Sequence, residues 1–305
     1  MDLIKRFQIF VNNPWRIFYN LNKRKISHII PDKIMLQLLY RAKMGKKLNL
    51  KNPVTFNEKL QWLKLYDHNP EYIKFVDKYE VRNYIAEKIG EEYLVPLLGV
   101  WDNVNDIDFD LLPNQFVLKC THDSGSVIIC KDKARFDVQK AKGKLQKAME
   151  TNFYWLYREW PYKNVKPRVV AEQYLEDNES EELSDYKIMC FNGKQKCTFT
   201  CTNRFSGTGL NVTFFDTEWN RLPFERHYKA DLKVIKKPKS YAEMVELAEK
   251  LSENIPFSRI DFYKTNNKIY FGEITLYPGS GFEEFEPVNW DTTLGSWIKL
   301  PDDHV

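Results

Sequence analysis

Two strand–turn–strand patterns in the second half of the chain constrain its fold more than any other feature. In the first, apolar runs flank Asn192-Gly193, the dipeptide that favours a type I′ hairpin turn. In the second, the runs 258–263 and 270–276 lie on either side of Asn266-Asn267. Strands joined by so few residues pair antiparallel. We therefore expect an α+β fold in which antiparallel strands and helices occur in blocks.

Changes in hydrophobic period predict the other elements. Helical periodicity dominates the first hundred residues, and Thr55 and Glu58 form a plausible capping box for the helix that follows. The predicted later helices are 77–89, 136 to about 157, and 240–253. The predicted strands ahead of the second hairpin are 116–120, 127–130, 168–175, 186–191 and 194–202.

Composition indicates a globular chain. Of the 305 residues, 43% are hydrophobic and 29% are charged, and no apolar run approaches the roughly 18 to 20 residues of a spanning helix. The N-terminus lacks the apolar region of a secretory signal, so we expect a cytoplasmic protein. The five cysteines have no metal-binding spacing and are expected to be reduced, buried thiols.

The first 52 residues are strongly basic. They contain twelve Lys or Arg and two Asp, a net charge of +10, whereas the remainder carries −6. Aromatic and aliphatic residues are interleaved with these charges. One interpretation is contact with an anionic membrane at its inner face, or with an acidic polymer or lipid-phosphate. The other is a basic helix packed on the body through its apolar face. No nucleic-acid reader motif accompanies the charge, so nucleic acid is not expected.

The late hairpin carries residues suited to bind Mg²⁺ against a nucleotide triphosphate. Arg259 and Asp261 share one face of their strand, and Glu273 and Thr275 share one face of the return strand. The two faces coincide only if the loop has an odd number of residues. We therefore expect a loop of three or five residues rather than a two-residue turn at Asn266-Asn267; either loop places Asp261 opposite Phe271 and Arg259 opposite Glu273. The alternative is a solvated hairpin with a cross-strand Arg–Glu pair.

A second candidate site is the loop 121–126, which follows Lys119. A Ser-Gly-Ser segment can offer backbone N–H groups to phosphate oxygens, and a lysine at the strand end adds positive charge. Alone the signal is weak, because short Ser/Gly loops join many hairpins. Its place in the chain strengthens it: the order Lys119, Glu172, then Asp261 and Glu273 is one in which a nucleotide site can be built.

Several motifs in chain order resemble the ATP-grasp superfamily, and within it the TupA-like branch found among genes for teichuronopeptide and capsular polysaccharide synthesis. The resemblance extends from about Pro53 to Pro287, and its motifs are 53–62, 77–78, 116–125, 185–193 and 271–278. It implies an ATP-grasp fold, in which two α+β subdomains with antiparallel sheets clasp ATP. The implied regions are a basic, mainly helical segment 1–76 and an ATP-grasp domain 77–305, divided into a lid-bearing subdomain 77–170 and a metal-binding subdomain 171–305.

Transferred to this chain residue by residue, the resemblance implies an ATP-binding site. The residues implied to hold the nucleotide are Lys78, Lys119, Ser124, Gly125, Ser126, Glu172, Gln173, Tyr174, Leu175 and Asp185. The two lysines contact the phosphates, and the Ser-Gly-Ser loop forms a flexible lid over them. Glu172 accepts from the adenine amino group, Leu175 donates its N–H to the ring, and Asp185 binds the ribose.

The resemblance also implies Mg²⁺ binding and phosphoryl transfer at the late hairpin. The implied metal ligands are Asp261, Glu273 and Thr275. Arg259 steadies the transferring phosphoryl group, and Lys187 also reaches the phosphates. Thr275 departs from the family pattern, because this position is commonly Asn and a threonine hydroxyl is a weaker ligand with shorter reach.

The implied activity is ATP-dependent carboxylate–amine ligation through an acyl phosphate. The family context points to an amino acid or amine joined to a uronic-acid-containing surface polysaccharide or a lipid-linked precursor. A sugar kinase would use the same site as far as phosphoryl transfer. A glycosyltransferase is the other alternative, because Asp106, Asp108 and Asp110 could hold a metal on a nucleotide sugar. No βαβ pattern precedes these residues, so a polar turn is favoured there.

Overall fold

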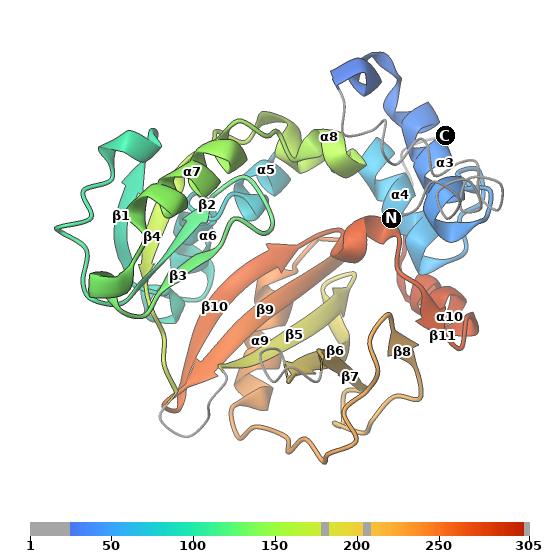
Figure 1. Ribbon diagram of the computed structural model, residues 1–305. Coiled ribbons are helices and arrows are strands. Elements are labelled where there is room, and N and C mark those ends of the chain that lie inside the picture. The colour runs from blue at the N-terminus through green and yellow to red at the C-terminus, as the bar shows by residue number, and fades with distance from the viewer. Residues whose placement is uncertain (1–24, 178–182, 204–208, 302–305) are drawn as a thin grey trace, which may run out of the picture.

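The computed structural model describes residues 25–177, 183–203 and 209–301, and two antiparallel sheets form its body (Figure 1). The smaller sheet has the order β1–β4–β2–β3, formed by Leu97–Trp101, Val169–Gln173, Phe116–Cys120 and Ile128–Cys130. The larger sheet has the order β10–β9–β5–β6–β7, formed by Lys268–Thr275, Phe257–Thr265, Ser184–Phe191, Lys194–Thr202 and Asn211–Phe215. A short sheet pairs β8 (Glu225–Arg226) with β11 (Phe285–Glu286).

Helices surround the two sheets. The α-helices are α3 (Asp32–Met44), α4 (Phe56–Tyr66), α5 (Glu71–Val76), α6 (Val81–Lys88), α7 (Val138–Met149), α8 (Tyr154–Tyr157), α9 (Tyr241–Leu251) and α10 (Asn289–Trp297). The 3₁₀ helices are η1 (Lys25–Ile29), η2 (Glu91–Tyr93), η3 (Val104–Asp106), η4 (Lys133–Arg135), η5 (Trp160–Asn164) and η6 (Pro278–Gly281). In Figure 1, α7 packs on the smaller sheet and α9 on the larger one, while α3, α4 and α10 gather at the opposite end. The predicted α+β class with antiparallel sheets is confirmed.

Two local sequence signals are confirmed directly. The Thr55 side chain accepts from the backbone N–H of Glu58 at 3.2 Å, and the Glu58 carboxylate accepts from the N–H of Thr55 at 3.1 Å, which completes the capping box of α4. The turn between β5 and β6 consists of Asn192 and Gly193, with φ of 49° and 76°. Positive φ at both positions is the type I′ geometry that matches the twist of the paired strands.

Two predicted helices have different bounds from those expected. The helix expected over 136–157 ends at Met149, and α8 is a separate turn after Asn152, whose side chain accepts from the N–H of Tyr154 at 3.0 Å. The helix expected from Asp77 begins at Val81. The Asp77 carboxylate accepts from the N–H groups of Tyr79 and Glu80 at 2.8 and 3.2 Å, so a side-chain-capped turn precedes the helix.

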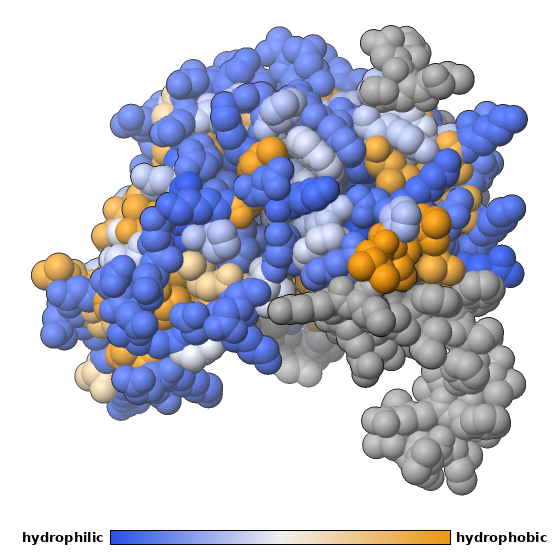
Figure 2. All heavy atoms as spheres, turned by 90° about the horizontal axis from the view of Figure 1, so that it is seen from above, coloured by the Kyte–Doolittle hydropathy of each residue, from blue (hydrophilic) through white to orange (hydrophobic). Residues whose placement is uncertain are grey.

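The two sheets have separate apolar cores. The larger sheet shares one core with α4, α5, α6, α9 and α10, whereas the smaller sheet has its own core, which includes Phe116, Leu118, Leu145 and Val169. The face seen in Figure 2 is mostly hydrophilic, with small hydrophobic patches between the polar residues. The molecule therefore consists of two sheet-based units with the helical region beside them.

The basic N-terminal segment is described only from residue 25. Within it, α3 buries Met35, Leu36 and Leu39, and its Tyr40 packs near Phe282, with ring centroids 6.2 Å apart. This part of the segment therefore packs on the body through its apolar face, as the second interpretation expects. The expected membrane or polymer contact falls largely on residues 1–24, which lie outside the described residues. In the described ranges, no helix has the length and apolar character needed to cross a membrane.

Candidate active site

The late hairpin closes with two residues, so the expected loop of three or five residues is wrong. Thr265 pairs with Lys268, and Asn266 and Asn267 form the turn with φ of 47° and 62°. The right-handed twist of paired strands favours this type I′ turn. With regular pairing throughout, the two-residue turn would place Asp261 and Glu273 on opposite faces of the sheet.

A β-bulge at Gly272 corrects the register. Phe271 pairs with Phe262, but Glu273 pairs with Asp261, so Gly272 is the extra residue on β10. A Cβ atom at Gly272 would lie 3.0 Å from the Asp261 carbonyl oxygen and 3.1 Å from the Tyr263 ring, so the close approach of the strands favours glycine. The bulge brings both carboxylates to one face, as expected, but Arg259 lies opposite Thr275 rather than Glu273.

Arg259 connects the two carboxylates of the hairpin. Its Nε and Nη2 donate to the two oxygens of Asp261 at 2.6 and 2.7 Å, and Nη2 also donates to Glu273 Oε1 at 2.9 Å. The Thr275 hydroxyl donates to the same Glu273 oxygen at 3.0 Å. Asp261 is only 2% exposed, whereas the Glu273 side chain is 43% exposed. The alternative of a solvated surface hairpin is therefore wrong for Arg259 and Asp261, and Glu273 forms the accessible edge.

Lys187 joins this cluster from the neighbouring strand β5. Its ammonium pairs with Asp185 at 2.9 Å and contacts the Asp261 carboxylate. Burial alone would raise the pKa of Asp261, but the charges of Arg259 and Lys187 lower it below its usual value. Burial likewise acts to lower the pKa of Lys187, but the charges of Asp261 and Asp185 raise it overall. Asp261 is therefore ionised and Lys187 protonated at neutral pH.

Lys119 on β2 and Lys78 ahead of α6 are predicted to contact phosphate, and each contacts an acceptor within the protein. Lys119 pairs with Glu172 across adjacent strands at 2.5 Å, and Arg82 lies 3.8 Å from the other oxygen of Glu172. The Lys78 ammonium contacts the carbonyl of Asp123, so this lysine holds the loop predicted to form the lid. The structure thus brings Lys119 and Glu172 together.

The loop 121–126 is fixed at its base and open at its tip. The Ser126 hydroxyl accepts from the N–H of Cys120 at 2.8 Å and donates to Asp123 Oδ1 at 2.7 Å. Ser124 and Gly125 are exposed, and Gly125 has a φ of 119°, a conformation that L side chains rarely adopt. Only the tip of the loop is therefore open to contact a ligand.

The segment after β4 connects the two sheets and contacts the tip of the late hairpin. The carbonyl of Glu176 accepts from the Thr265 hydroxyl at 2.5 Å and from the Asn266 amide at 3.3 Å. Gln173 donates its N–H to the carbonyl of Pro96 at 3.0 Å.

Comparison with known proteins identifies the family. The family model "TupA-like ATPgrasp" matches residues 58–299, which is most of the chain. The chain belongs to the TupA-like ATP-grasp family. This confirms the resemblance and the ATP-grasp fold expected from the sequence. No curated protein matches this TupA-like chain.

Solved structures with similar folds include two D-alanine–D-alanine ligases and one synthetase. The Bacillus anthracis ligase complexed with ATP is 15% identical, with a TM-score of 0.39, and the alignment covers 67% of this chain and 54% of the ligase. The Helicobacter pylori ligase is 16% identical, with a TM-score of 0.41 and coverages of 80% and 69%. D-cycloserine synthetase DcsG is 12% identical, with a TM-score of 0.41 and coverages of 72% and 70%. The TupA-like chain thus spans about half the length of the Bacillus ligase, and the family match alone carries the assignment.

The late hairpin of the TupA-like chain has the donor chemistry for Mg²⁺. Asp261, Glu273 and Thr275 present carboxylate and hydroxyl oxygens, which Mg²⁺ prefers over nitrogen or sulfur ligands. No group of three or more His, Cys, Asp or Glu in the described ranges is arranged to hold a metal. Two carboxylates could hold Mg²⁺ here only together with substrate phosphates and water, an arrangement that is usual for this ion.

Two further polar residues, Glu159 and Tyr162, lie between α8 and β4 and were not among the predicted site residues. Burial raises the pKa of Tyr162 well above its ordinary value, and the charges of Glu159, Glu273 and Asp123 add to this effect. Glu159 is buried and accepts from the hydroxyl of Ser280, which is 121 residues away, so no local motif could indicate this contact.

Two other motifs of the TupA-like chain have structural roles. Asp106, Asp108 and Asp110 are exposed, and Asp108 accepts from the N–H of Asp110 at 2.9 Å, as expected for a polar turn. His122 is buried, and its Nε2 lies 3.1 Å from the carbonyl of Ala148, which joins the loop base to α7.

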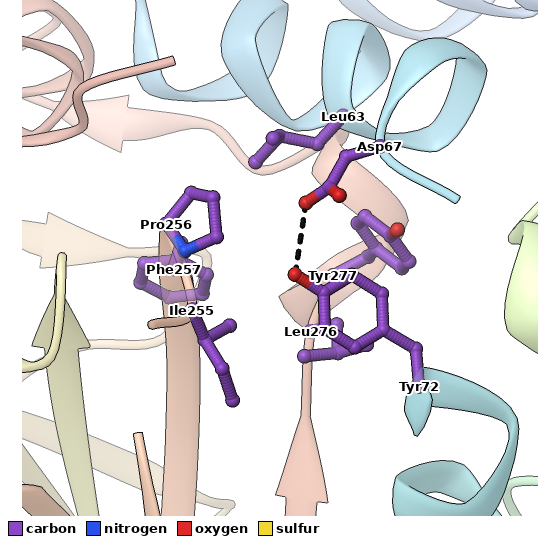
Figure 3. Close-up of a pocket in the computed structure, with 8 residues that line it drawn as sticks. All are labelled: Leu63, Asp67, Tyr72, Ile255, Pro256, Phe257, Leu276 and Tyr277. Atoms are coloured by element: carbon purple, nitrogen blue, oxygen red, sulfur yellow. Dashed lines mark hydrogen bonds between the residues drawn. The ribbon is translucent and has the colours of Figure 1, made fainter. Parts of the chain in front are cut away.

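A small cavity lies apart from these clusters, between α4, α5 and the larger sheet (Figure 3). Its walls are mainly apolar, and the Tyr72 hydroxyl donates to Asp67 Oδ2 at 2.9 Å beside it. Its volume is about 10 Å³, close to the minimum for a single water molecule. This cavity cannot hold a nucleotide and is a packing feature of the core.

Proposed function

We propose that this chain is an ATP- and Mg²⁺-dependent ligase that activates a carboxylate as an acyl phosphate and joins it to an amine. The observation that carries the proposal is the cluster on β5, β9 and β10. It unites two carboxylates and a hydroxyl for Mg²⁺ with two cations for phosphoryl groups, Arg259 and Lys187. The family match independently supports ATP as the nucleotide.

The geometry of the late hairpin supports a nucleotide that lies along it. Thr265 at the tip contacts Glu176, which follows the segment expected to bind adenine, and Asp261 lies four residues before Thr265 on β9. Four residues of a strand span about 13 Å. An extended triphosphate nucleotide can bridge this length, with its base near Leu175 and its phosphates near Asp261 and Glu273.

We propose that nucleotide binding changes the ion-pair partners of the charged side chains in the site. In the structure, Lys119 pairs with Glu172 and Lys187 with Asp261. The phosphates take over the two lysines, Glu172 accepts from the adenine amino group, and Asp261 becomes a metal ligand. The exchange avoids leaving a buried charge without a partner, which would be costly in a low-dielectric site.

The reaction then requires positioning and charge stabilisation rather than a protein nucleophile. The terminal phosphoryl group of ATP passes to the substrate carboxylate, which gives an acyl phosphate and ADP. The amine attacks the acyl carbon, phosphate leaves, and the nitrogen loses a proton to give the amide. Arg259 and Lys187 stabilise the transferring group, and the 124–126 loop excludes water that would hydrolyse the intermediate. Bound Mg²⁺ offsets the charge of the phosphates.

For the substrates, we infer a uronic-acid-containing surface polysaccharide or its precursor as one partner and an amino acid or amine as the other. The TupA-like family context and the +10 charge of residues 1–52 support an acidic glycan. The same basic segment supports peripheral contact with an anionic membrane. Flotation with anionic liposomes, with and without residues 1–52, tests that contact, and equal partitioning of the two proteins contradicts it.

A screen for product release tests the proposed reaction. Purified protein is incubated with Mg²⁺, ATP, amino acids, and uronic acids in free, nucleotide-linked or lipid-linked form. A ligase releases ADP and phosphate in equal amounts, and only when both substrates are present. A sugar kinase releases ADP while the phosphate stays on the sugar, and a glycosyltransferase transfers label from a UDP-sugar without consuming ATP. Either of these results contradicts the ligase proposal.

A further inference from the structure

Two buried residues of opposite charge, Lys64 and Glu159, hold Ser280 outside the proposed phosphoryl-transfer cluster. Lys64 on α4 is 2% exposed, and Glu159, between α8 and η5, is 6% exposed. The Lys64 ammonium donates to the carbonyl of Ser280 at 2.7 Å, the carbonyl of Tyr157 at 3.1 Å and the side chain of Gln61 at 3.1 Å. Glu159 Oε1 accepts from the Ser280 hydroxyl at 2.5 Å. Ser280 is therefore held from two sides by elements distant in the sequence.

The loop that carries Ser280 depends on such contacts for its conformation. Gly279, Ser280 and Gly281 have φ of 53°, 56° and 64°, so three consecutive residues lie in the left-handed region. For Ser280 this conformation is strained, and it persists only where the surroundings impose it. The Gln61 amide adds a further bond, to the carbonyl of Gly281 at 2.6 Å. Helix α4 thus provides two side chains that fix η6.

The same loop follows directly on β10 and the candidate metal ligands. Ser280 lies five positions after Thr275 in the sequence. Burial raises the pKa of Glu159, the charge of Lys64 opposes this effect, and the charge of Glu273 adds to it. Burial lowers the pKa of Lys64 to about 7, an effect that Glu159 opposes and Lys43 reinforces. The loop that Lys64 and Glu159 hold is therefore only a few residues from the candidate metal ligands.

We propose that Lys64 and Glu159 are positioning residues that lock η6 and so hold the end of β10, with Glu273 and Thr275, in the orientation that Mg·ATP requires. This inference rests on the proposed function. In this proposal α4, which precedes both sheets in the sequence, helps to position residues of the ATP site. The segment with α8 and η5, which lies between α7 and α4 in Figure 1, carries Glu159 and links the smaller sheet to this lock.

The test compares Lys64→Met with Lys59→Met in the full chain. Lys59 is on the same helix and also donates to a carbonyl, that of Ile298 at 2.7 Å, but this carbonyl follows α10 rather than β10. Two measurements are made on each variant: calorimetry of ATP binding, with Mg²⁺ and with EDTA, and hydrogen exchange of the backbone amides 276–283. Glu159→Gln is the second variant, because glutamine can still accept from Ser280 while the charge is removed.

We expect Lys64→Met and Glu159→Gln to weaken Mg·ATP binding about tenfold, within the range of coupling between linked sites. In EDTA, the ATP affinity of both variants should stay within about twofold of the wild type, because the substitutions disturb only the candidate metal ligands. Exchange over 276–283 should be faster in both variants, and Lys59→Met should match the wild type in every measurement. Equal losses with and without Mg²⁺, or unchanged exchange, would overturn the proposal. If the wild type binds no Mg·ATP, the proposed function fails, and the exchange data alone decide whether the pair locks the loop.

Discussion

The β9–β10 hairpin and the β2–β3 loop carry the two expected halves of the ATP site, but they are stabilised very differently. In the hairpin, Asp261 is buried, and both of its oxygens are held by Arg259 and Lys187. At the tip of the β2–β3 loop, Ser124 and Gly125 are exposed and the fixed bonds lie at the base. The difference indicates one half that is preorganised for chemistry and another that can move when the ligand binds.

The packing of the two sheets fits the same contrast. The larger sheet shares an extensive apolar core with five helices, whereas β3 has three residues and Ile129 on it is 46% exposed. Regions with few buried contacts open at lower free energy than the core. We therefore expect closure over the nucleotide to come from the smaller sheet, with the hairpin as the fixed reference.

The largest expected effect is loss of stability on removing the buried charge of the hairpin. Asp261→Asn leaves Arg259 and Lys187 with only their other partners, and breaking a buried ion pair costs about 3 kcal/mol or more. Urea unfolding measures this change. Glu71→Gln is the matched control, because Glu71 pairs with Lys74 at the surface and its loss should not shift the unfolding midpoint. Equal unfolding midpoints for the two variants would contradict the view that the hairpin is held more firmly than the β2–β3 loop.

The bulge provides a second test of the fixed half. Gly272→Ala places a Cβ 3.0 Å from the Asp261 carbonyl oxygen, and such overpacking costs about 1 to 3 kcal/mol. Gly143→Ala in α7 is the control: no atom lies within 4 Å of its added Cβ, so this change should stabilise the helix by up to about 1 kcal/mol. Thermal unfolding and Mg·ATP calorimetry should both separate the two variants. A neutral Gly272→Ala would show that the register does not depend on the bulge.

At the mobile half, the expected effects are smaller and fall on affinity. Gly125→Ala puts a side chain at a φ of 119° in open space, so the cost is backbone strain of about 1 kcal/mol or less at a loop tip that can adjust. We expect nucleotide affinity to fall a few-fold while the unfolding midpoint stays near that of the wild type. A stability loss as large as that of Gly272→Ala would contradict the assignment of this loop to a weakly held lid.

The pH dependence of stability should distinguish the buried carboxylate from exposed ones. The pKa of Asp261 is lower in the folded chain than its ordinary value of 3.8. Its stabilising contribution is therefore complete above the pKa of the unfolded chain and is lost as the pH falls through the lower folded value. The stability difference between the wild type and Asp261→Asn should be constant from pH 5 to 7 and shrink below about pH 4. A difference that grows on acidification would reverse the sign of the shift.

Local sequence patterns predicted the parts of the fold that depend on neighbouring residues. The capping box at Thr55, the turn at Asn192-Gly193 and most strand positions depend on residues a few positions apart. The predicted register of the late hairpin was wrong. It missed a bulge that depends on the close approach of Gly272 to Asp261 on the facing strand. A glycine inside a strand pattern is the signal that could have indicated it.

The sequence suggested candidate site residues but not their contacts. Its motifs include Lys119, Glu172, Lys187 and Asp261, yet nothing in them predicts the pairs Lys119–Glu172 and Lys187–Asp261. Glu159 carries no recognisable motif, since its partner Ser280 is 121 residues away. Such pairs follow from the packing of separate elements, which a single sequence does not specify.

Calorimetry of ATP binding to the wild type and to Glu273→Gln, with and without Mg²⁺, tests the central claim that the late hairpin is the metal and phosphoryl-transfer edge. Glu253→Gln, an exposed glutamate paired with Lys88, is the control. We predict Mg²⁺-dependent binding in the wild type and the control, and a loss on the order of 100-fold in Glu273→Gln, because a direct ligand should matter at least as much as outer-shell partners. Mg²⁺-independent binding in the wild type, or full affinity for Mg·ATP in Glu273→Gln, would contradict the claim.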